Sequence, residues 1–259
     1  MKQNSRLLFV AVLLSIVMMA VAILAIIFVP QWQYRTFLVE GDYSRLVDVY
    51  ESKLQNLWGY DDKLPEDLEG KLYTAKEQFR TEQIDYSAME QELTEIFATG
   101  YADQTVVEEI SLEVEQLNTS KQAYLQAEDQ YMKHKYVDAL ASYGQVIADD
   151  IHYADAQSRI TAIPAEFRDY TDTAAAEKEN TSNFEEANQL LETYLSFAED
   201  EAFSQRFARN QALIEADDYA QQGEFEEAEA ALGDYRDDDL AASKIRDYQQ
   251  KLSETEIGA

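Results

Sequence analysis

The amino-acid sequence predicts an all-α protein, in which one N-terminal transmembrane helix is followed by an α-solenoid, a stack of helical hairpins. Three observations support this fold class. A long apolar run without charge occupies residues 7–29. A helix-spaced pattern of apolar residues then occurs five times. No stretch shows the sustained period-two alternation, bounded by hairpin turns, that is typical of strands.

The apolar run at residues 7–29 contains no charged residue, and Ser15 is its only polar side chain. As a helix it extends roughly 35 Å, enough to cross a hydrocarbon core of about 30 Å. The alternative is a cleaved signal peptide, whose apolar region is usually only about 7–15 residues long. Pro30 ends the predicted span, and Trp32 and Tyr34 follow closely. Because aromatic residues favour the membrane interface, we expect an uncleaved anchor that contacts the lipid bilayer.

Basic residues near the run predict its orientation. Lys2 and Arg6 precede it, whereas Arg35 and Arg45 lie beyond it among acidic residues, so the bias is mild. Since basic residues favour the cytoplasmic side, we expect a cytoplasmic N-terminus at residues 1–6. A juxtamembrane connector at residues 30–40 and an extracytoplasmic domain would follow.

The composition is strongly acidic. The formal net charge is −30, and residues 30–259 carry −32 because the first 29 residues hold two basic and no acidic groups. This charge argues against binding nucleic acid or an anionic lipid surface and favours basic partners. Disorder is not expected, since 46% of the residues are hydrophobic and 12% are aromatic.

Five segments share one pattern: an aromatic residue, a small or apolar residue three positions later, and a large apolar residue seven positions later. These offsets lie on one helix face. A turn-like pair precedes each segment, so we expect each to open the second helix of a hairpin. The segments are Tyr43/Leu46/Tyr50, Tyr86/Met89/Leu93, Tyr136/Ala139/Tyr143, Phe184/Ala187/Leu191 and Phe225/Ala228/Leu232, and the pairs are Gly41-Asp42, Ile84-Asp85, His134-Lys135, Ser182-Asn183 and Gly223-Glu224.

Two stretches within this pattern, AEDQYMKHKYVDALASYGQVIADD and AQQGEFEEAEAALGDY, resemble tetratricopeptide repeats. The resemblance implies stacked helical hairpins over residues 41–236 that bind peptides or protein partners in a concave groove. The aromatic markers lie 43, 50, 48 and 41 residues apart, whereas that family has a period near 34, so an irregular stack is implied. No ligand-binding residue is carried over. The resemblance extends over residues 120–160 and 205–236, partly over 174–198 and weakly over 36–98.

Other residues predict where the remaining helices begin. Pro65 suits the first turn of a helix. Asp103 is placed to cap a long helix over residues 104–133. Pro164 is expected to begin a further helix.

The C-terminal segment, residues 237–259, is predicted to be a capping helix and a tail. Asp237, Asp238 and Asp239 form an acidic start for a polar helix over residues 240–252. Polarity suits a terminal repeat, whose outer face meets water.

The sequence offers little for catalysis or metal binding. It contains no cysteine, and its only histidines, His134 and His152, are expected at the surface. With 51 acidic residues, carboxylate pairs on one helix face arise by chance. Asp149-Asp150 and the aspartate run at 237–239 lack the pattern of a calcium loop, so we interpret both as helix caps. We therefore expect no catalytic residue, cofactor or metal site.

The 17 tyrosines are the most ambiguous feature. Those in the repeat pattern are expected to pack between helices with the hydroxyl at the rim. Others are less constrained, and some of them are candidates to face a partner. The first group is Tyr43, Tyr86, Tyr136 and Tyr143; the second is Tyr101, Tyr153, Tyr170, Tyr194 and Tyr248.

These features favour a non-catalytic function: a membrane-anchored scaffold or adaptor that docks protein partners. The first alternative is a structural or envelope-spacing protein that associates with itself through its helices. The second is a glycan-cleaving enzyme with a carboxylate-only site, which requires two carboxylates to converge in a cleft.

Overall fold

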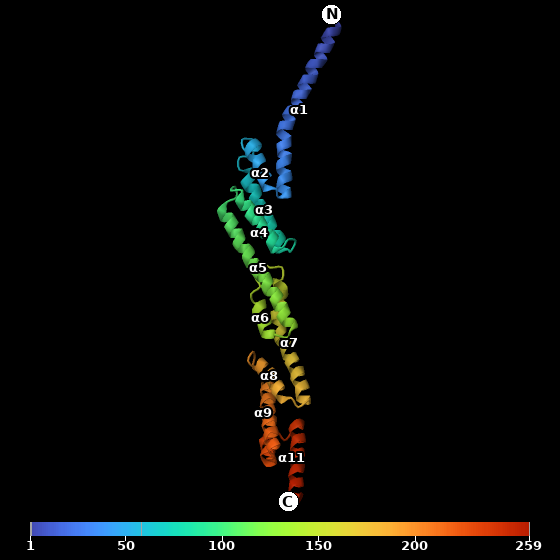
Figure 1. Ribbon diagram of the computed structural model, residues 1–259, viewed down its shortest axis with the longest axis vertical. Helices are drawn as coiled ribbons and strands as arrows, with labels where there is room; N and C mark the ends of the chain where they lie inside the picture. Colours follow the sequence, from blue (N-terminus) through green and yellow to red (C-terminus); the bar gives the residue numbers. More distant parts are fainter. Residues whose placement is uncertain (1, 58, 259) are drawn as a thin grey trace. The chain divides into compact units, whose positions relative to one another are not determined.

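The computed structural model describes residues 2–57 and 59–258, with side chains for residues 12–57 and 59–254. Every regular element among these residues is a helix, which confirms the all-α prediction (Figure 1). The elements are α1 (Lys2–Glu40), α2 (Tyr43–Val49), the π-helical turn η1 (Tyr50–Leu54), α3 (Lys63–Arg80), α4 (Tyr86–Ala98), α5 (Gln104–Met132), α6 (Tyr136–Tyr143), α7 (Tyr153–Asn180), α8 (Phe184–Leu195), α9 (Glu201–Gln222), α10 (Phe225–Ala231), the 3-10 turn η2 (Gly233–Tyr235) and α11 (Asp239–Gly258).

The chain forms two compact units. Unit 1 comprises Met1–Ala123 and Val146–Tyr153, and unit 2 comprises Tyr124–Gln145 and Ala154–Ala259. Helix α5 therefore begins in unit 1 and ends in unit 2.

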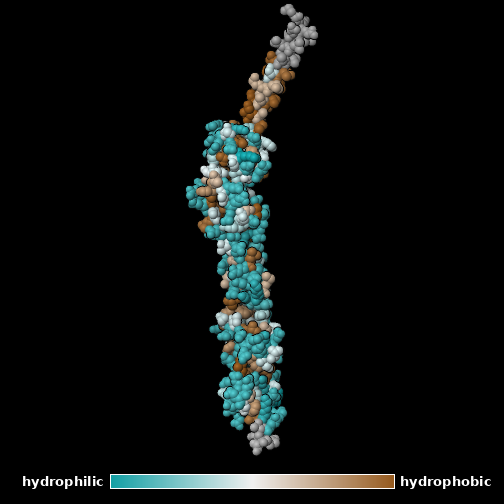
Figure 2. Space-filling view, viewed as in Figure 1, coloured by the Kyte–Doolittle hydropathy of each residue, from teal (hydrophilic) through white to brown (hydrophobic). Residues whose placement is uncertain are grey.

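Helix α1 contains the apolar run. Among the described residues it is the one helix long and apolar enough to cross a membrane, with a mean hydropathy of 3.2. Its apolar side chains from Val12 to Val29 are exposed and form the hydrophobic surface seen in Figure 2. The helix continues through Pro30, where the sequence predicts the end of the span, and ends only at Glu40. The predicted connector at residues 30–40 is thus helical.

Pro164 does not begin a helix, so that prediction is wrong: the residue lies inside α7. A proline in a helix interior removes one hydrogen bond and costs about 3 kcal/mol. Here the side chains on either side of it are buried, with Ile163 at 0% and Phe167 at 4% exposure. Burying two such side chains contributes about 1.5–3 kcal/mol each, which outweighs the local penalty.

The five predicted hairpin helices all begin at the predicted aromatic residue. Helices α2, α4, α6, α8 and α10 start at Tyr43, Tyr86, Tyr136, Phe184 and Phe225. The residues three and seven positions later are buried in every case. The pattern therefore marks the face by which each helix packs.

The turns before these helices share one geometry. A residue with left-handed backbone follows one or two positions after the first helix of each hairpin, and the next N–H donates to the carbonyl five residues earlier at 2.8–3.0 Å, as in a Schellman motif. Only two of the five left-handed positions hold glycine. The residues are Gly41 (φ 74°), Glu82 (61°), His134 (57°), Ser182 (58°) and Gly223 (80°).

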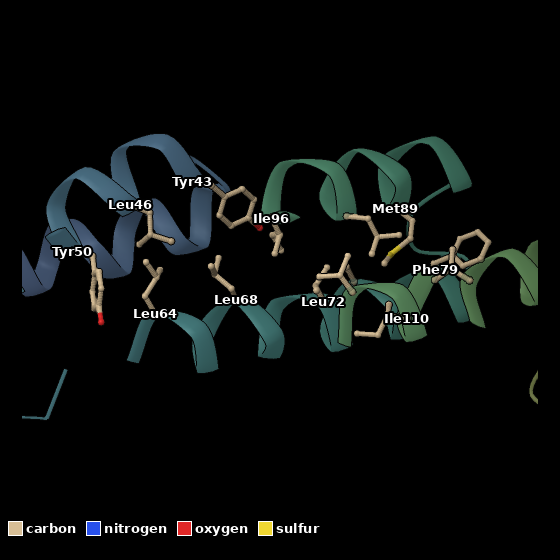
Figure 3. Close-up of a cluster of buried hydrophobic side chains, with 14 of the residues drawn as sticks. Tyr43, Leu46, Tyr50, Leu64, Leu68, Leu72, Phe79, Met89, Ile96 and Ile110 are labelled. Carbon is tan, nitrogen blue, oxygen red and sulfur yellow. The ribbon is translucent and has the colours of Figure 1, made fainter. Parts of the chain in front are cut away.

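Unit 1 has its own hydrophobic core. The α3 leucines Leu64, Leu68 and Leu72 are fully buried. In Figure 3, Leu64 and Leu68 lie opposite the side chains of α2 and η1, and Leu72 lies beside Ile96 and Met89 of α4. Residues from α4 and α5 complete this core. In unit 2, a second cluster joins α8, α9, α10 and α11, with Leu213, Ala216, Ala228 and Leu232 at 0% exposure. These cores hold the hairpins of each unit in register.

Candidate interaction surface

The two histidines occupy structural positions. His134 lies at the left-handed turn position, where its ring is exposed and stacks on Tyr170 with 4.3 Å between ring centroids. His152 is less exposed than expected: it is 26% exposed, and its Nε2 atom lies 3.0 Å from Glu82 Oε1. The position of His134 is thus explained by packing on Tyr170, and that of His152 by its contact with the carboxylate of Glu82.

Many of the tyrosine hydroxyls form hydrogen bonds with carboxylates. In six pairs a phenol donates a hydrogen bond to an aspartate or glutamate of another element or turn. This arrangement matches the expectation that tyrosines pack between helices with the hydroxyl at the rim. The pairs are Tyr34–Asp67, Tyr43–Glu92, Tyr101–Glu51, Tyr131–Glu166, Tyr143–Glu128 and Tyr248–Asp217.

These contacts raise the pKa of the phenols. For Tyr34, Tyr43, Tyr143 and Tyr248, burial raises the pKa most, and the carboxylate partner adds to it. Tyr194 and Tyr248, which the sequence left as candidates to face a partner, are 6% and 3% exposed. Tyrosines therefore contribute to the interior more than to an open surface.

A groove in unit 1 lies between α2 and the end of α4. We call it the α2–α4 groove; its volume is about 610 Å³, and its lining residues are Gly41, Asp42, Tyr43, Ser44, Val47, Asp48, Glu95, Ala98 and Thr99. The aliphatic and aromatic side chains supply an apolar wall. Three carboxylates supply negative charge.

The carboxylates of the α2–α4 groove differ in their partners. Asp42 caps α2 by accepting from the backbone N–H of Arg45 at 3.2 Å. Asp48 and Glu95 are exposed, and neither forms an ion pair with any described residue. Glu95 also accepts a hydrogen bond from the side-chain amide of Gln91 at 2.8 Å. The groove thus combines two carboxylates that lack a cationic partner with an apolar wall.

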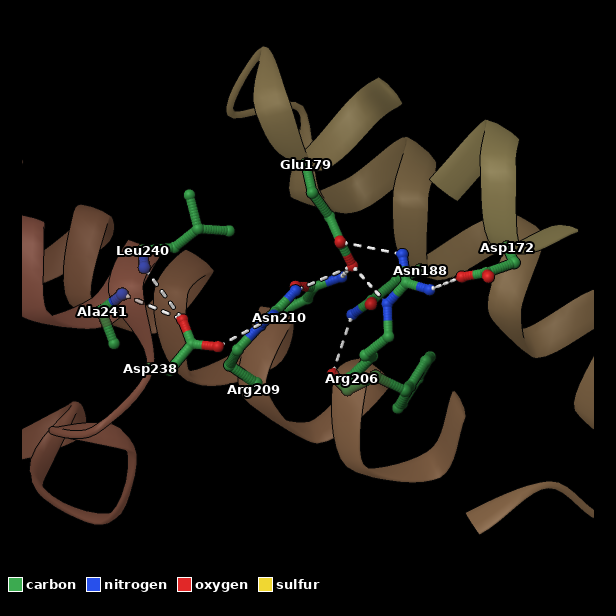
Figure 4. A network of polar contacts seen from close by, with 10 residues as sticks. Asp172, Glu179, Asn188, Arg206, Arg209, Asn210, Asp238, Leu240 and Ala241 are labelled. Atoms are coloured by element: carbon green, nitrogen blue, oxygen red, sulfur yellow. Dashed lines mark hydrogen bonds and ion pairs between the residues drawn. The ribbon is translucent and has the colours of Figure 1, made fainter. Parts of the chain in front are cut away.

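A second groove, of about 670 Å³, lies in unit 2 beside α9. Arg206 and Arg209 line it, but both guanidinium groups are already engaged (Figure 4). Arg206 pairs with Asp172 and Glu179, and Arg209 Nη1 lies 2.9 Å from Asp238. Its two arginines are therefore neutralised within the protein, and its other carboxylate, Glu201, accepts a hydrogen bond from Gln205 at 3.3 Å.

Glu179 is the centre of that network. Its carboxylate accepts from Arg206 Nη2 at 2.9 Å and Asn210 Nδ2 at 2.9 Å, and Arg209 Nη2 lies 2.9 Å away. Burial alone would raise the pKa of Glu179, but the hydrogen bonds and positive charges outweigh it and lower the pKa. Sequence reasoning missed this site, because Glu179 lies 27 residues from its nearest arginine partner.

A second buried polar contact in unit 1 was also missed. Ser120 donates to Asp150 Oδ2 at 2.7 Å, and both side chains are nearly inaccessible, at 1% and 4% exposure. Asp150 also accepts from the backbone N–H of His152 at 2.9 Å, just before α7. Asp150 thus caps the segment before α7, as expected, and its buried hydrogen bond also joins this segment to α5. At the other predicted cap, Asp238 accepts from the backbone N–H of Leu240 and of Ala241, as expected.

Within the part of the chain that the structure describes, no group of three or more histidine, cysteine or carboxylate residues is arranged to hold a metal ion. No known family model, curated protein or solved structure matches the chain.

Proposed function

We propose that the chain is a membrane-anchored scaffold or adaptor that binds a protein partner in the α2–α4 groove. The observation that carries this proposal is the pair of carboxylates, Asp48 and Glu95, that lack ion-pair partners beside an apolar wall. The matching ligand is a peptide segment with lysine or arginine next to an apolar side chain. The net charge of residues 30–259 would attract such a segment over roughly a Debye length, about 8 Å at physiological salt.

Typical interaction energies show how much binding affinity the carboxylates and the apolar wall of the groove can each supply. An exposed ion pair contributes about 0.2–1 kcal/mol, so two carboxylates supply at most about 2 kcal/mol. That corresponds to roughly a 30-fold change in affinity. The remaining affinity must come from buried apolar contacts, for which Val47 and Ala98 line the groove.

The test uses the full chain, solubilised from its own membranes, as bait for cross-linked partners. The double variant Asp48→Asn/Glu95→Gln should lose most of the captured partner. The control Glu109→Gln/Glu115→Gln removes the same charge from exposed positions of α5 and should keep it. Equal capture by both variants would refute the groove. Recovery of the chain itself as the sole product would favour the self-associating spacer instead.

The same proposal places the N-terminus in the cytoplasm and the domain outside it, on the basis of Lys2 and Arg6. Because the chain has no cysteine, single-cysteine variants provide a direct test. A membrane-impermeant maleimide applied to intact cells should label Glu109→Cys and leave Ser5→Cys unlabelled until lysis. The opposite pattern would place the domain in the cytoplasm and move its partner there.

A further inference from the structure

Helix α1 does not end at the edge of its apolar run but becomes part of unit 1. Pro30 is buried, and Tyr34, one turn later, is 2% exposed. The Tyr34 ring packs on Tyr50 and Tyr60 with centroids 6.4 and 5.8 Å apart, and its hydroxyl donates to Asp67 at 2.9 Å. The apolar run is therefore joined to the domain by a packed helix rather than by a free linker.

The hairpin formed by α1 and α2 brings the chain back toward the apolar run. From Glu40, Pro30 lies ten residues back along α1, or about 15 Å. From Tyr43, Leu54 lies eleven residues onward through α2 and η1, or about 16 Å. Because the two segments are antiparallel, with Tyr34 against Tyr50, Leu54 returns to the level of Pro30. Figure 1 shows the loop after η1 at the end of the hairpin that faces the apolar part of α1.

The loop that follows is described at residues 55–57 and 59–62, and these residues are held in place. The Tyr50 hydroxyl donates to the carbonyl oxygens of Tyr60 and Asp61 at 3.0 and 2.8 Å. Backbone bonds from Leu57 N–H to Leu54 and from Tyr60 N–H to Leu57 close its turns. Gln55 and Asn56 are exposed at its start. The loop thus has a fixed height on α1.

The charge of this region differs from that of the rest of the domain. Residues 53–63 contain two basic and two acidic residues, together with Leu57, Trp58 and Tyr60. Residues 64–259, in contrast, contain 15 basic and 45 acidic residues. The Tyr60 ring packs on Tyr34, but a segment without net charge that also contains leucine and tryptophan suits a membrane–water interface better than the acidic remainder of the domain does.

We propose that loop 55–62 lies in the headgroup region of the same bilayer that α1 crosses, and that lipid is the partner of this surface. This inference rests on the membrane anchoring proposed above and not on the α2–α4 groove. Its consequence is that the domain is fixed at a set height on the membrane, with the groove about 15 Å further out, the combined length of α2 and η1 from the loop.

The experiment uses the full chain in nanodiscs of phosphatidylcholine. Three single-cysteine variants carry an environment-sensitive fluorophore: Met18→Cys in the apolar run, Gln55→Cys in the loop, and Ser44→Cys at the opposite end of α2. Met18, Gln55 and Ser44 are all exposed, so the label displaces no buried side chain. Lipids with a nitroxide headgroup report which labels touch the bilayer surface.

We expect blue-shifted emission from the labels at positions 18 and 55 and aqueous emission from position 44. Headgroup nitroxides should quench position 55 more strongly than position 44. A lipid signal at position 18 with equal, aqueous signals at 55 and 44 would overturn the loop contact and leave the anchor intact. An aqueous signal at position 18 would overturn the anchor and the loop contact together. Circular dichroism of each variant checks that the helices are retained.

Discussion

Replacing Glu179 by glutamine should destabilise unit 2 and leave unit 1 unchanged. The side chain is 7% exposed and meets two guanidinium groups at 2.9 Å, together with the Asn210 amide. Removing one partner of a buried ion pair costs about 3–5 kcal/mol when the remaining charge is left without compensation. Glutamine keeps one acceptor oxygen, and Arg206 and Arg209 keep Asp172 and Asp238 as partners, so we expect a loss of no more than about 3 kcal/mol, the lower end of that range.

Hydrogen exchange followed by mass spectrometry suits a chain with two units, since one melting curve need not be two-state. A loss of 3 kcal/mol should speed exchange about 100-fold for α9 amides that exchange through opening of unit 2. Amides of α3 in unit 1 serve as the internal control. The matched variant Asp172→Asn removes a 55% exposed partner of Arg206 and should cost at most about 1 kcal/mol. Equal effects of the two variants would refute the central role of Glu179.

The pH dependence of the stability of unit 2 gives a second check, because the direction of the expected change follows from the pKa of Glu179. The pKa of Glu179 is lowered in the folded chain, so the folded state binds this proton less tightly than the unfolded state. The stabilisation is therefore present above the unfolded pKa, about 4.3, and is lost as the pH falls through the lower folded value. The difference between wild type and Glu179→Gln should shrink between pH 7 and about pH 3. A difference that stays constant would show that the charge of Glu179 is not what stabilises unit 2.

Three further perturbations test the turns, the helix faces and the tyrosines. Ser182→Gly should stabilise unit 2 by up to about 1 kcal/mol, and Gly223→Ala should destabilise it by about as much, because both residues have left-handed backbone. Hydrogen exchange of α8 and α10 measures the two changes in stability. Changes of the same sign would contradict the strain argument. Ala228→Trp should lower the free energy of unfolding by about 1–3 kcal/mol or more, since the alanine is 0% exposed. The control Ala230→Trp, on the exposed face of α10, should be tolerated. Similar denaturation midpoints for the two variants would mean that the helix face is misassigned. Above the ordinary phenol pKa of about 10, the stability of the folded chain should fall as the pH rises, because the folded state holds the protons of tyrosines such as Tyr143 more tightly than the unfolded state does. Ultraviolet titration checks this prediction. Ionisation of every phenol near about pH 10 in the folded chain would contradict it.

The hairpin helices could be predicted because their information is local. An aromatic residue with buried positions at offsets of three and seven identifies the packing face, and Tyr43, Phe184 and Phe225 each begin a helix. The turn geometry could be predicted only where glycine marks it. At His134 and Ser182 the left-handed conformation is imposed by the packing of the two helices, which single-residue preferences do not contain.

The three prolines show where local preferences fail as a guide. A proline is locally a good helix start, which is why Pro65 was predicted correctly in the first turn of α3. Pro30 and Pro164 lie inside helices instead. Side chains on both sides of Pro164 are buried, and Tyr34 docks α1 onto unit 1 just after Pro30. Tertiary burial decides these cases, and it depends on residues far along the chain.

The acidic composition becomes informative only once the ion pairs are assigned. With 51 acidic residues, neither Asp48 nor Glu95 is distinctive in the sequence, and 47 positions separate them. Folding places both beside one groove, while most basic side chains are committed to other carboxylates, as Arg206 and Arg209 are to Glu179. A carboxylate without a cationic partner beside apolar surface is the feature that an incoming basic residue can complete. The α2–α4 groove has two such carboxylates, whereas the larger groove beside α9 has one, Glu201, next to two guanidinium groups that disfavour a basic ligand. That difference, rather than the total charge, makes the α2–α4 groove the better candidate.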